Sequence, residues 1–494
     1  MRRSAYSKTG WLILVLVAAV PRLLGAFFLP NAFGDAYVYI RDIGVLSTKL
    51  SSGRFAITDL YGFWLPLYQF ISAVVNLFVR NGFYSGKVVS ALFGVGSCLL
   101  IYSLVLGLTA NRGAALLSFA LMALNPLHIF YSASAMTDVP FTFFVLASLH
   151  FVLRRGWIPA AIFAALAGLT RVEGWMFIAL IPAIQLLRGR RISFVALAVM
   201  CVPPLVWFYI SWKATGDWLA CFRSRQQYHE WLMAANPALA RVSFGGIFRD
   251  GVTLLVSTDV AVLIASFIAG WFVLKRLGRY RRAQAGTHED KILAPVVFFF
   301  TFLGFLLAAY LTRQAPIIFP RYGLLLFSLG IPVLAWTFLM LRQRKPQWAR
   351  TLLISIIVIC VLDWGIQFAG AVGTVNQYRA QRTVADYLRE HYQPAVDGLI
   401  FSDEGNVTAL SGIAPDKFLT SSDAPKDREG FLVFLKEKNV AYLVFVKSVT
   451  STPAKLFPEL QDGNGNELFQ PVLHAQARFL RMEIWLYRVR TVVR

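Results

Sequence analysis

Residues 11–29 of the chain read WLILVLVAAVPRLLGAFFL, an apolar run in which Arg22 is the one charged side chain. A helix needs about 20 apolar residues to cross the hydrocarbon core of a bilayer. The run follows a basic N-terminal stretch, as the core of a signal peptide does, but Pro21 and Arg22 interrupt it and no clean cleavage site follows. We therefore expect an uncleaved first membrane span.

The same pattern recurs along most of the chain, which is 57% apolar and only 15% charged. A soluble domain carries about 25% charged residues, so this composition predicts a polytopic α-helical membrane protein. Ten further spans are expected, which brings the total to eleven: 88–109, 113–131, 139–153, 157–170, 174–187, 192–212, 252–274, 292–311, 323–341 and 351–372.

The segment 65–80 differs from these spans. Its polar residues Gln69, Ser72, Asn76 and Arg80 recur every three or four positions, which places them on one stripe of a helix. The segment is also short for a span, so we expect a juxtamembrane helix lying in the membrane surface, within an outer loop 30–87.

The net charge of +22 is distributed in a way that argues against nucleic acid as a partner. The basic residues gather in short loops between apolar runs, which is typical of the cytoplasmic loops of membrane proteins. With eleven spans and 65–80 lying flat, every strongly basic short loop, including 275–291, falls on one side. This arrangement predicts a cytoplasmic N-terminus, a multi-pass protein of the cell (plasma) membrane, and a non-cytoplasmic C-terminal end.

The composition changes near residue 373, so we divide the chain into a membrane domain, 1–372, and a soluble domain, 373–494. The segment 378–392 reads as an amphipathic helix, and 428–437 as another. Four segments have strand patterns and complete a small C-terminal α/β domain on the non-cytoplasmic side: 398–403, 441–447, 471–476 and 484–489.

Two acidic residues are expected at the outer face of the membrane. Asp35 follows the first span in NAFGDAYVYIRD, and Asp138 precedes the span 139–153 in YSASAMTDVP. A carboxylate near a lipid interface can act as a general base, because partial desolvation raises its pKa. Each acid could instead simply cap the helix that follows it. Asp259 and Asp363 fall within spans, and we expect them to form hydrogen bonds between helices.

Several basic residues are expected at the same face. Arg171 and Glu173 lie in the turn LTRVEGW, and they either pair with each other or place Arg171 against an anionic headgroup. Arg321 and Tyr322 open the span 323–341, and Arg22 lies in the outer half of the first span. Either arginine could snorkel to the interface without another role. Converging guanidinium groups would suit recognition of a phosphate.

The ordered series of motifs resembles the GT-C superfamily of polytopic glycosyltransferases, specifically the bacterial group similar to dolichyl-phosphate-mannose protein mannosyltransferases (glycosyltransferase family 39). The resemblance covers about residues 10–345. It rests on Asp35 in the first outer loop, WLPLYQF (64–70), NPLHIFYSASAMTDVP (125–140), LTRVEGW (169–175) and FPRYG (319–323).

The resemblance implies a hexosyl- or mannosyltransferase-like enzyme that takes a sugar from a polyprenyl-phosphate donor. Transfer to a protein, glycan or lipid acceptor would occur outside the cytoplasm with inversion. Asp35 would be the catalytic base and Asp138 a second acid. Arg171, Glu173, Arg321, Tyr322 and Arg22 would form the donor-phosphate site. Many members have two adjacent acids in the first loop, whereas Ala36 follows Asp35 here. That departure puts in doubt any role that needs paired carboxylates.

The alternative function is a transporter or flippase of lipid-linked sugars. Such a protein typically has inverted repeats and charged residues near the membrane midplane, whereas the acids here gather at one face. No cofactor is indicated. The sequence has neither a zinc-type ligand spacing nor a phosphate-binding glycine loop, so a divalent metal is left open but unsupported.

Overall fold

The computed structural model describes residues 8–32, 34–235, 243–277, 291–421, 423–446, 451–477 and 483–490. Arg279, Arg281 and Arg282 of the basic loop lie outside the described residues. The chain forms two compact units. The first contains Met1–Asn31, Ile43–His229 and Leu239–Phe368, and the second contains Ala32–Asp42, Glu230–Ala238 and Ala369–Arg494.

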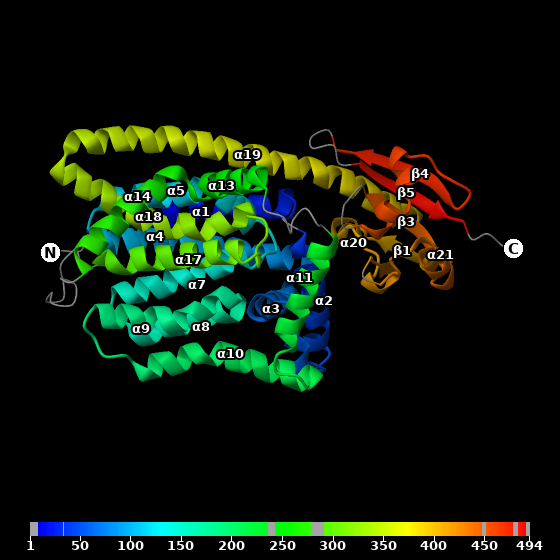
Figure 1. The fold of residues 1–494 in the computed structure, drawn as a ribbon, viewed down its shortest axis with the longest axis horizontal. Coiled ribbons are helices and arrows are strands. Elements are labelled where there is room, and N and C mark those ends of the chain that lie inside the picture. Colours follow the sequence, from blue (N-terminus) through cyan, green and yellow to red (C-terminus); the bar gives the residue numbers. More distant parts are fainter. Residues whose placement is uncertain are drawn as a thin grey trace. The chain divides into compact units, whose positions relative to one another are not determined.

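Long apolar helices dominate the first unit (Figure 1). Six helices among the described residues are long and apolar enough to cross a membrane. They are α1 (Lys8–Phe28), α4 (Gly82–Thr109), α10 (Phe194–Thr215), α17 (Leu293–Leu311), α18 (Pro320–Arg344) and α19 (Pro346–His391). The predicted helical membrane fold is therefore confirmed.

Two further predicted spans are each divided into two helices that meet at an angle. The segment 113–131 forms α5 (Arg112–Leu124) and α6 (Pro126–Ser132), which are bent by 59°. Asn125 accepts a hydrogen bond from His128 N and Pro126 occupies the first helical position, so a new helix begins there. Counting each bent pair as one span gives up to eight candidate spans among the described residues.

The segment 252–274 was expected to be continuous and is not. It divides into α13 (Phe244–Thr258) and α14 (Val260–Lys275), with an angle of 84° between them. Asp259, at φ 70°, breaks the helix and caps α14 by accepting a hydrogen bond from Ala261 N. The error arose because hydropathy reports how apolar a segment is and not whether its backbone is straight.

Asp259 and Asp363 make hydrogen bonds between helices, as predicted. The Oδ2 atom of Asp363, on α19, accepts a hydrogen bond of 3.3 Å from Val260 N. Cys360 Sγ, one turn earlier on α19, donates to Asp259 Oδ2 over 3.0 Å. These contacts join the membrane part of α19 to the break between α13 and α14.

Shorter helices complete the first unit. The predicted spans 139–153, 157–170 and 174–187 correspond to apolar helices of fewer than 18 residues. They are α7 (Asp138–Leu153), α8 (Trp157–Thr170), the 3-10 turn η2 (Val172–Met176) and α9 (Phe177–Leu187).

The segment 65–80 forms α3 (Leu67–Val79), which follows the 3-10 turn η1 (Ile57–Leu60). Figure 1 shows α3 almost end-on, whereas the long helices of the first unit run across the view. α3 is one of the apolar helices that are too short to count as a candidate span, and its place in the membrane surface stays a prediction.

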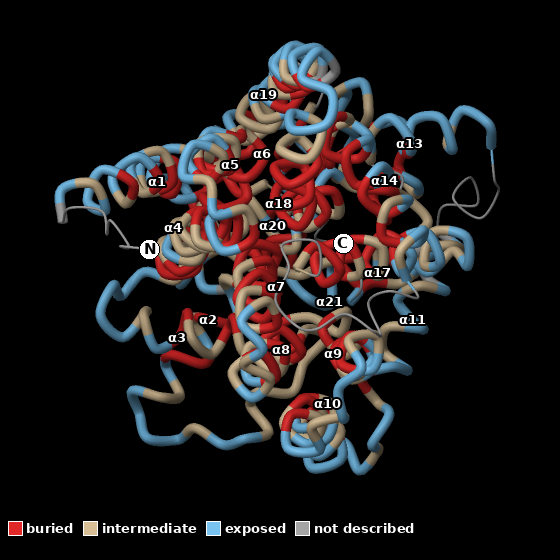
Figure 2. The backbone as a smooth tube through the Cα atoms, turned by 90° about the vertical axis from the view of Figure 1, so that its left-hand side faces the viewer, coloured by how far each residue is buried: buried red, intermediate tan, exposed pale blue. Residues whose placement is uncertain are grey.

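The core of the first unit lies around α4, α7 and α18, and α7 and α18 are drawn largely as buried in Figure 2. Gly94 of α4 permits the closest approach. A Cβ atom at Gly94 would lie 2.3 Å from Ser132 Oγ and 3.1 Å from Arg22 Cδ. Only a residue without a side chain lets α1, α4 and α6 meet there.

The second unit contains a five-stranded sheet in the order β2-β1-β3-β5-β4. β1 pairs in parallel with β2 and β3, while β5 pairs antiparallel with β3 and β4. The strands are β1 (Leu399–Ser402), β2 (Phe418–Leu419), β3 (Val440–Val446), β4 (Phe469–Gln476) and β5 (Glu483–Val489).

Helices cover both faces of this sheet, so the predicted α/β domain is confirmed. Val384 and Leu388 of α19 pack against one face. Phe431 and Leu435 of α21 (Arg428–Glu437) pack against the other. The four predicted strands and the helix 428–437 are present, and the two-residue strand β2 was missed because it is too short to show an alternating pattern.

The Gly94 contact gives a test of this packing. Gly94→Ala should destabilise the protein by about 1–3 kcal/mol, because its methyl group would overlap Ser132. Gly107→Ala, on the same helix, is the matched control, since its Cβ would meet nothing within 4 Å. In detergent, the melting temperature of Gly94→Ala should lie well below that of the control. Equal melting temperatures would contradict the packing described.

Candidate functional site

The N-terminal part of α4 holds the neighbouring segments together through buried polar groups. Lys87 Nζ donates hydrogen bonds to Ala26 O over 3.1 Å and to Leu29 O over 2.6 Å. These carbonyls belong to the end of α1, where helical backbone oxygens lack partners within the helix. The lysine therefore fixes the end of α1, and with it the start of the segment that follows.

The turn between α6 and α7 is held from both sides. Ser90 of α4 donates to Met136 O over 3.1 Å, and Asn31 Oδ1 accepts a hydrogen bond of 2.9 Å from Ala135 N. Asn31 lies four residues before Asp35, so the chain limits the distance between their Cα atoms to about 14 Å.

Three predicted site residues meet in one cluster, which we call the acid–arginine cluster: Asp138, Arg171 and Glu173. Arg171 Nη1 lies 2.8 Å from Asp138 Oδ1, and Nη2 lies 2.7 Å from Glu173 Oε1. The Arg171 and Glu173 pair that the sequence suggested is confirmed, with Asp138 as a further partner.

The cluster is well removed from water. The Asp138 side chain is 6% exposed, and the Arg171 side chain is 18% exposed. The Arg171 guanidinium also lies 5.9 Å from the centre of the Phe141 ring. In such surroundings, ion pairs and hydrogen bonds hold their geometry more firmly than they do in water.

One atom of the cluster has no protein partner. Asp138 Oδ2 is buried, and among the described residues it accepts no hydrogen bond. A buried carboxylate oxygen without a partner is costly, so this atom needs a hydrogen-bond donor from outside the described chain. It is the point in the cluster that a ligand can complete.

Arg22 is fully buried and bound to the protein. Nη1 donates to Ala18 O and Ala123 O, while Nη2 donates to Met122 O and to His128 Nδ1 at 2.6 Å. Met122 and Ala123 end α5, where the helix dipole favours a cation. These contacts give Arg22 a structural role at the bend between α5 and α6.

Arg321 and Tyr322 open α18, as the sequence predicted. The Arg321 guanidinium lies 5.5 Å from the centres of both the Phe319 and Tyr322 rings. Aromatic rings on either side hold the guanidinium near the start of the helix.

Asp35 is the first residue of α2 (Asp35–Ser51), and it is half-buried. It belongs to the second unit, together with the C-terminal domain. Asp42, further along α2, pairs with Arg41 at 3.1 Å. Burial raises the pKa of the Asp42 carboxyl, and Arg41 partly opposes that change.

Lys87 and Asn31 were missed from the sequence. Both border apolar runs, where a single polar residue usually marks the end of a span. Asn31 opens the stretch NAFGDAYVYIRD and Lys87 ends the loop 30–87, but their partners are backbone atoms that no sequence pattern reveals.

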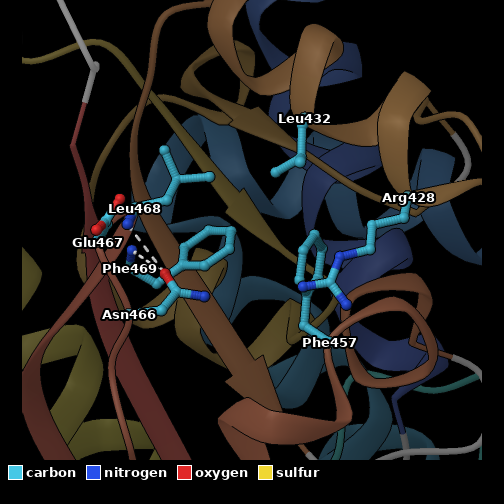
Figure 3. A pocket seen from close by; sticks show the side chains of 7 residues that line it. All are labelled: Arg428, Leu432, Phe457, Asn466, Glu467, Leu468 and Phe469. Carbon is cyan, nitrogen blue, oxygen red and sulfur yellow. Dashed lines mark hydrogen bonds between the residues drawn. The ribbon is translucent and has the colours of Figure 1, made fainter.

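The C-terminal domain has a hollow of about 330 Å³ (Figure 3). It is lined by Arg428, Leu432, Phe457, Asn466, Glu467, Leu468 and Phe469. Phe457 and Phe469 are 1% and 0% exposed, so neither offers an open ring face on which a sugar could stack. None of the predicted site residues lines this hollow. Among the described residues, no group of three or more His, Cys, Asp or Glu could hold a metal ion.

The family model described as dolichyl-phosphate-mannose-protein mannosyltransferase matches residues 60–217. This region contains α4 and the whole acid–arginine cluster. No curated protein sequence matches the chain.

Two solved structures resemble the fold along nearly its whole length. ArnT from Cupriavidus metallidurans bound to undecaprenyl phosphate has a TM-score of 0.53 at 14% identity, covering 97% of this chain and 98% of that one. An Archaeoglobus fulgidus oligosaccharyltransferase tethered to an acceptor peptide has a TM-score of 0.52 at 12% identity, covering 94% and 73%. The resemblance stated from the sequence is confirmed at the level of the fold, and the chain has the membrane fold of the GT-C glycosyltransferases.

Proposed function

We propose that the protein is an integral membrane glycosyltransferase that takes a sugar from a polyprenyl-phosphate donor. The observation that carries the proposal is the acid–arginine cluster, which lies inside the region that matches the mannosyltransferase family model. The undecaprenyl phosphate bound by ArnT, which has a similar fold, supports the choice of donor. The acceptor is a protein, a glycan or a lipid on the non-cytoplasmic side.

In the proposed reaction Asp35 is the general base. Its carboxylate removes the proton from the acceptor hydroxyl or amine as that group attacks the anomeric carbon. The bond from that carbon to the phosphate oxygen breaks, and the polyprenyl phosphate leaves with the electron pair. Attack from the face opposite the phosphate inverts the configuration. No metal enters this scheme.

The ion pairs refine the role of Arg171. One guanidinium is shared by two carboxylates, and Arg225 also interacts electrostatically with Glu173. All three guanidinium nitrogens of Arg171 donate hydrogen bonds to Asp138 or Glu173. We therefore assign Arg171 to orienting Asp138, with Glu173 holding Arg171 in place.

The remaining roles follow from the contacts of each side chain. Asp138 Oδ2 is open to hydrogen-bond donors, and the hydroxyl groups of a donor sugar suit it. Arg321, next to Tyr322 at the start of α18, is the phosphate contact in the proposal, because a guanidinium group suits a phosphate. Arg22 takes no part in the proposed phosphate site because its terminal nitrogens bind backbone carbonyls and His128.

The orienting role of Arg171 can be measured. Arg171→Met leaves two carboxylates without their counter-charge, which should destabilise the protein by about 3 kcal/mol. The double variant Arg171→Met/Asp138→Asn should recover part of that loss. Arg190→Met, at an exposed position, is the control and should unfold like the wild type. Thermal unfolding in detergent measures the stability of the wild type and of these three variants. An Arg171→Met protein as stable as the control would contradict this assignment.

The base assignment predicts a selective loss of chemistry. Asp35→Asn should reduce transfer by at least about 100-fold while binding of undecaprenyl phosphate persists, because only proton removal is lost. In a strain that expresses this variant alone, mass spectrometry should show sugar-loaded polyprenyl phosphate accumulating as in a strain without the protein. Asp42→Asn, further along the same helix, is the control, and its strain should contain nearly the wild-type amount of sugar-loaded polyprenyl phosphate. Wild-type lipid levels with Asp35→Asn would exclude Asp35 as the base.

A further inference from the structure

The sheet of the second unit has a carboxyl edge of the kind at which α/β proteins bind ligands. β1 lies between β2 and β3, and all three strands are parallel. The chain passes from β1 to β2 on one side of it and then to β3 on the other side. Ligands of open α/β sheets bind outside the carboxyl ends of the strands at such a reversal of strand order. Asp403, Glu404, Gly405 and Asn406 directly follow β1.

Three side chains at this edge form a row of hydrogen-bonded planar groups: Glu404, Gln381 and Asn406. Gln381, on α19, is 5% exposed, and its Nε2 atom donates to Glu404 Oε2 over 2.9 Å. Asn406 Nδ2 donates to Gln381 Oε1. An ionised carboxylate can only accept, so Glu404 fixes the Gln381 amide, which in turn fixes the Asn406 amide.

Each end of the row has an oxygen that lacks a protein partner. Asn406 Oδ1 is buried and accepts no hydrogen bond from the part of the chain that the structure describes. Within the same described residues, the side-chain hydrogen bond of Glu404 is the one that Oε2 accepts from Gln381, which leaves Oε1 available. Burial raises the pKa of the Glu404 carboxyl, with Gln381 opposing and Asp403 adding to the rise. The buried Asn406 Oδ1, which lacks a donor among the described residues, points to a ligand that donates hydrogen bonds, and Glu404 Oε1 is available to the same ligand.

The neighbouring Asp403 is not available in this way. Its two oxygens accept hydrogen bonds from Ser421 N over 2.7 Å and from Ser421 Oγ over 2.6 Å. The edge therefore offers one open carboxylate next to one amide oxygen. A single carboxylate with an amide suits neutral hydroxyl donors, and no group of three metal-type ligands exists among the described residues.

This edge lies directly against the first outer loop. A Cβ atom at Gly405 would lie 3.1 Å from the Cβ atom of Tyr37, so the two backbones approach closely. Tyr37 is 7% exposed and follows Asp35 by two residues, and both belong to the second unit with Gly405. A ligand held by Glu404 is thus placed beside the loop that carries the proposed base.

We propose that Glu404 and Asn406 bind hydroxyl groups of a sugar on the acceptor, which makes this edge an acceptor-binding site for a glycan. The inference rests on the proposed glycosyltransferase function. Two oxygen acceptors, on side chains bonded to the same amide, can accept hydrogen bonds from two hydroxyl groups of a glycan. A serine or threonine side chain offers only one hydroxyl and would leave the second acceptor without a donor.

The test uses the full chain in lipid nanodiscs and methyl glycosides of mannose, glucose and galactose as probes. Saturation-transfer NMR should show binding of at least one glycoside to the wild type. Glu404→Gln keeps the size of the side chain but removes its charge, and it should weaken that binding by about tenfold. Glu437→Gln, an exposed carboxylate on α21, is the matched control and should bind like the wild type.

Several results would overturn the proposal: no glycoside binds the wild type, Glu404→Gln binds as the wild type does, or a threonine peptide binds through Glu404 in place of the glycosides. A melting temperature of Glu404→Gln equal to that of the wild type shows that lost binding is not lost folding. Undecaprenyl phosphate binding, measured on the same samples, reports separately on the proposed function. Glycoside binding through Glu404 without any binding of that lipid would uphold this site and contradict the proposed donor.

Discussion

A charged side chain inside a bilayer must find its partners within the protein, because hydrocarbon offers none. The buried cations of this chain meet that constraint in two ways. Arg22 and Lys87 bind backbone carbonyls near helix ends, where the oxygens lack partners within the helix. Arg171 binds two carboxylates. The first kind of contact joins helices, whereas the second leaves one carboxylate oxygen, Asp138 Oδ2, open to a ligand.

The position of the site follows from these contacts. Lys87 fixes the end of α1, and Asn31 and Ser90 hold the turn that leads to Asp138. Gly94 lets α4 approach α6 closely enough for this arrangement. Within the second unit, a sheet edge lies next to Tyr37, two residues after Asp35.

Much of the fold could be predicted from the sequence because apolar length and strand alternation are local properties. The apolar runs 11–29 and 88–109 and the strand 441–447 were correctly expected, and the pairing of Arg171 with Glu173 was one of the two alternatives considered. The break at Asp259 was not, because it depends on a backbone angle and on the partner helix α19. The burial of Arg22 and the row from Glu404 to Asn406 depend on residues far apart in sequence, which no local pattern reports.

The most direct measurement follows the sugar itself. A strain without the protein would supply polyprenyl phosphate loaded with tritiated sugar, together with envelope acceptor. Both are added to proteoliposomes that contain the purified protein, and the chemical form of the label is determined. If the protein is a glycosyltransferase, the label becomes covalently bound to the acceptor while an equal amount of polyprenyl phosphate is released. Label that remains on the lipid and only changes leaflet would exclude sugar transfer and identify a translocator.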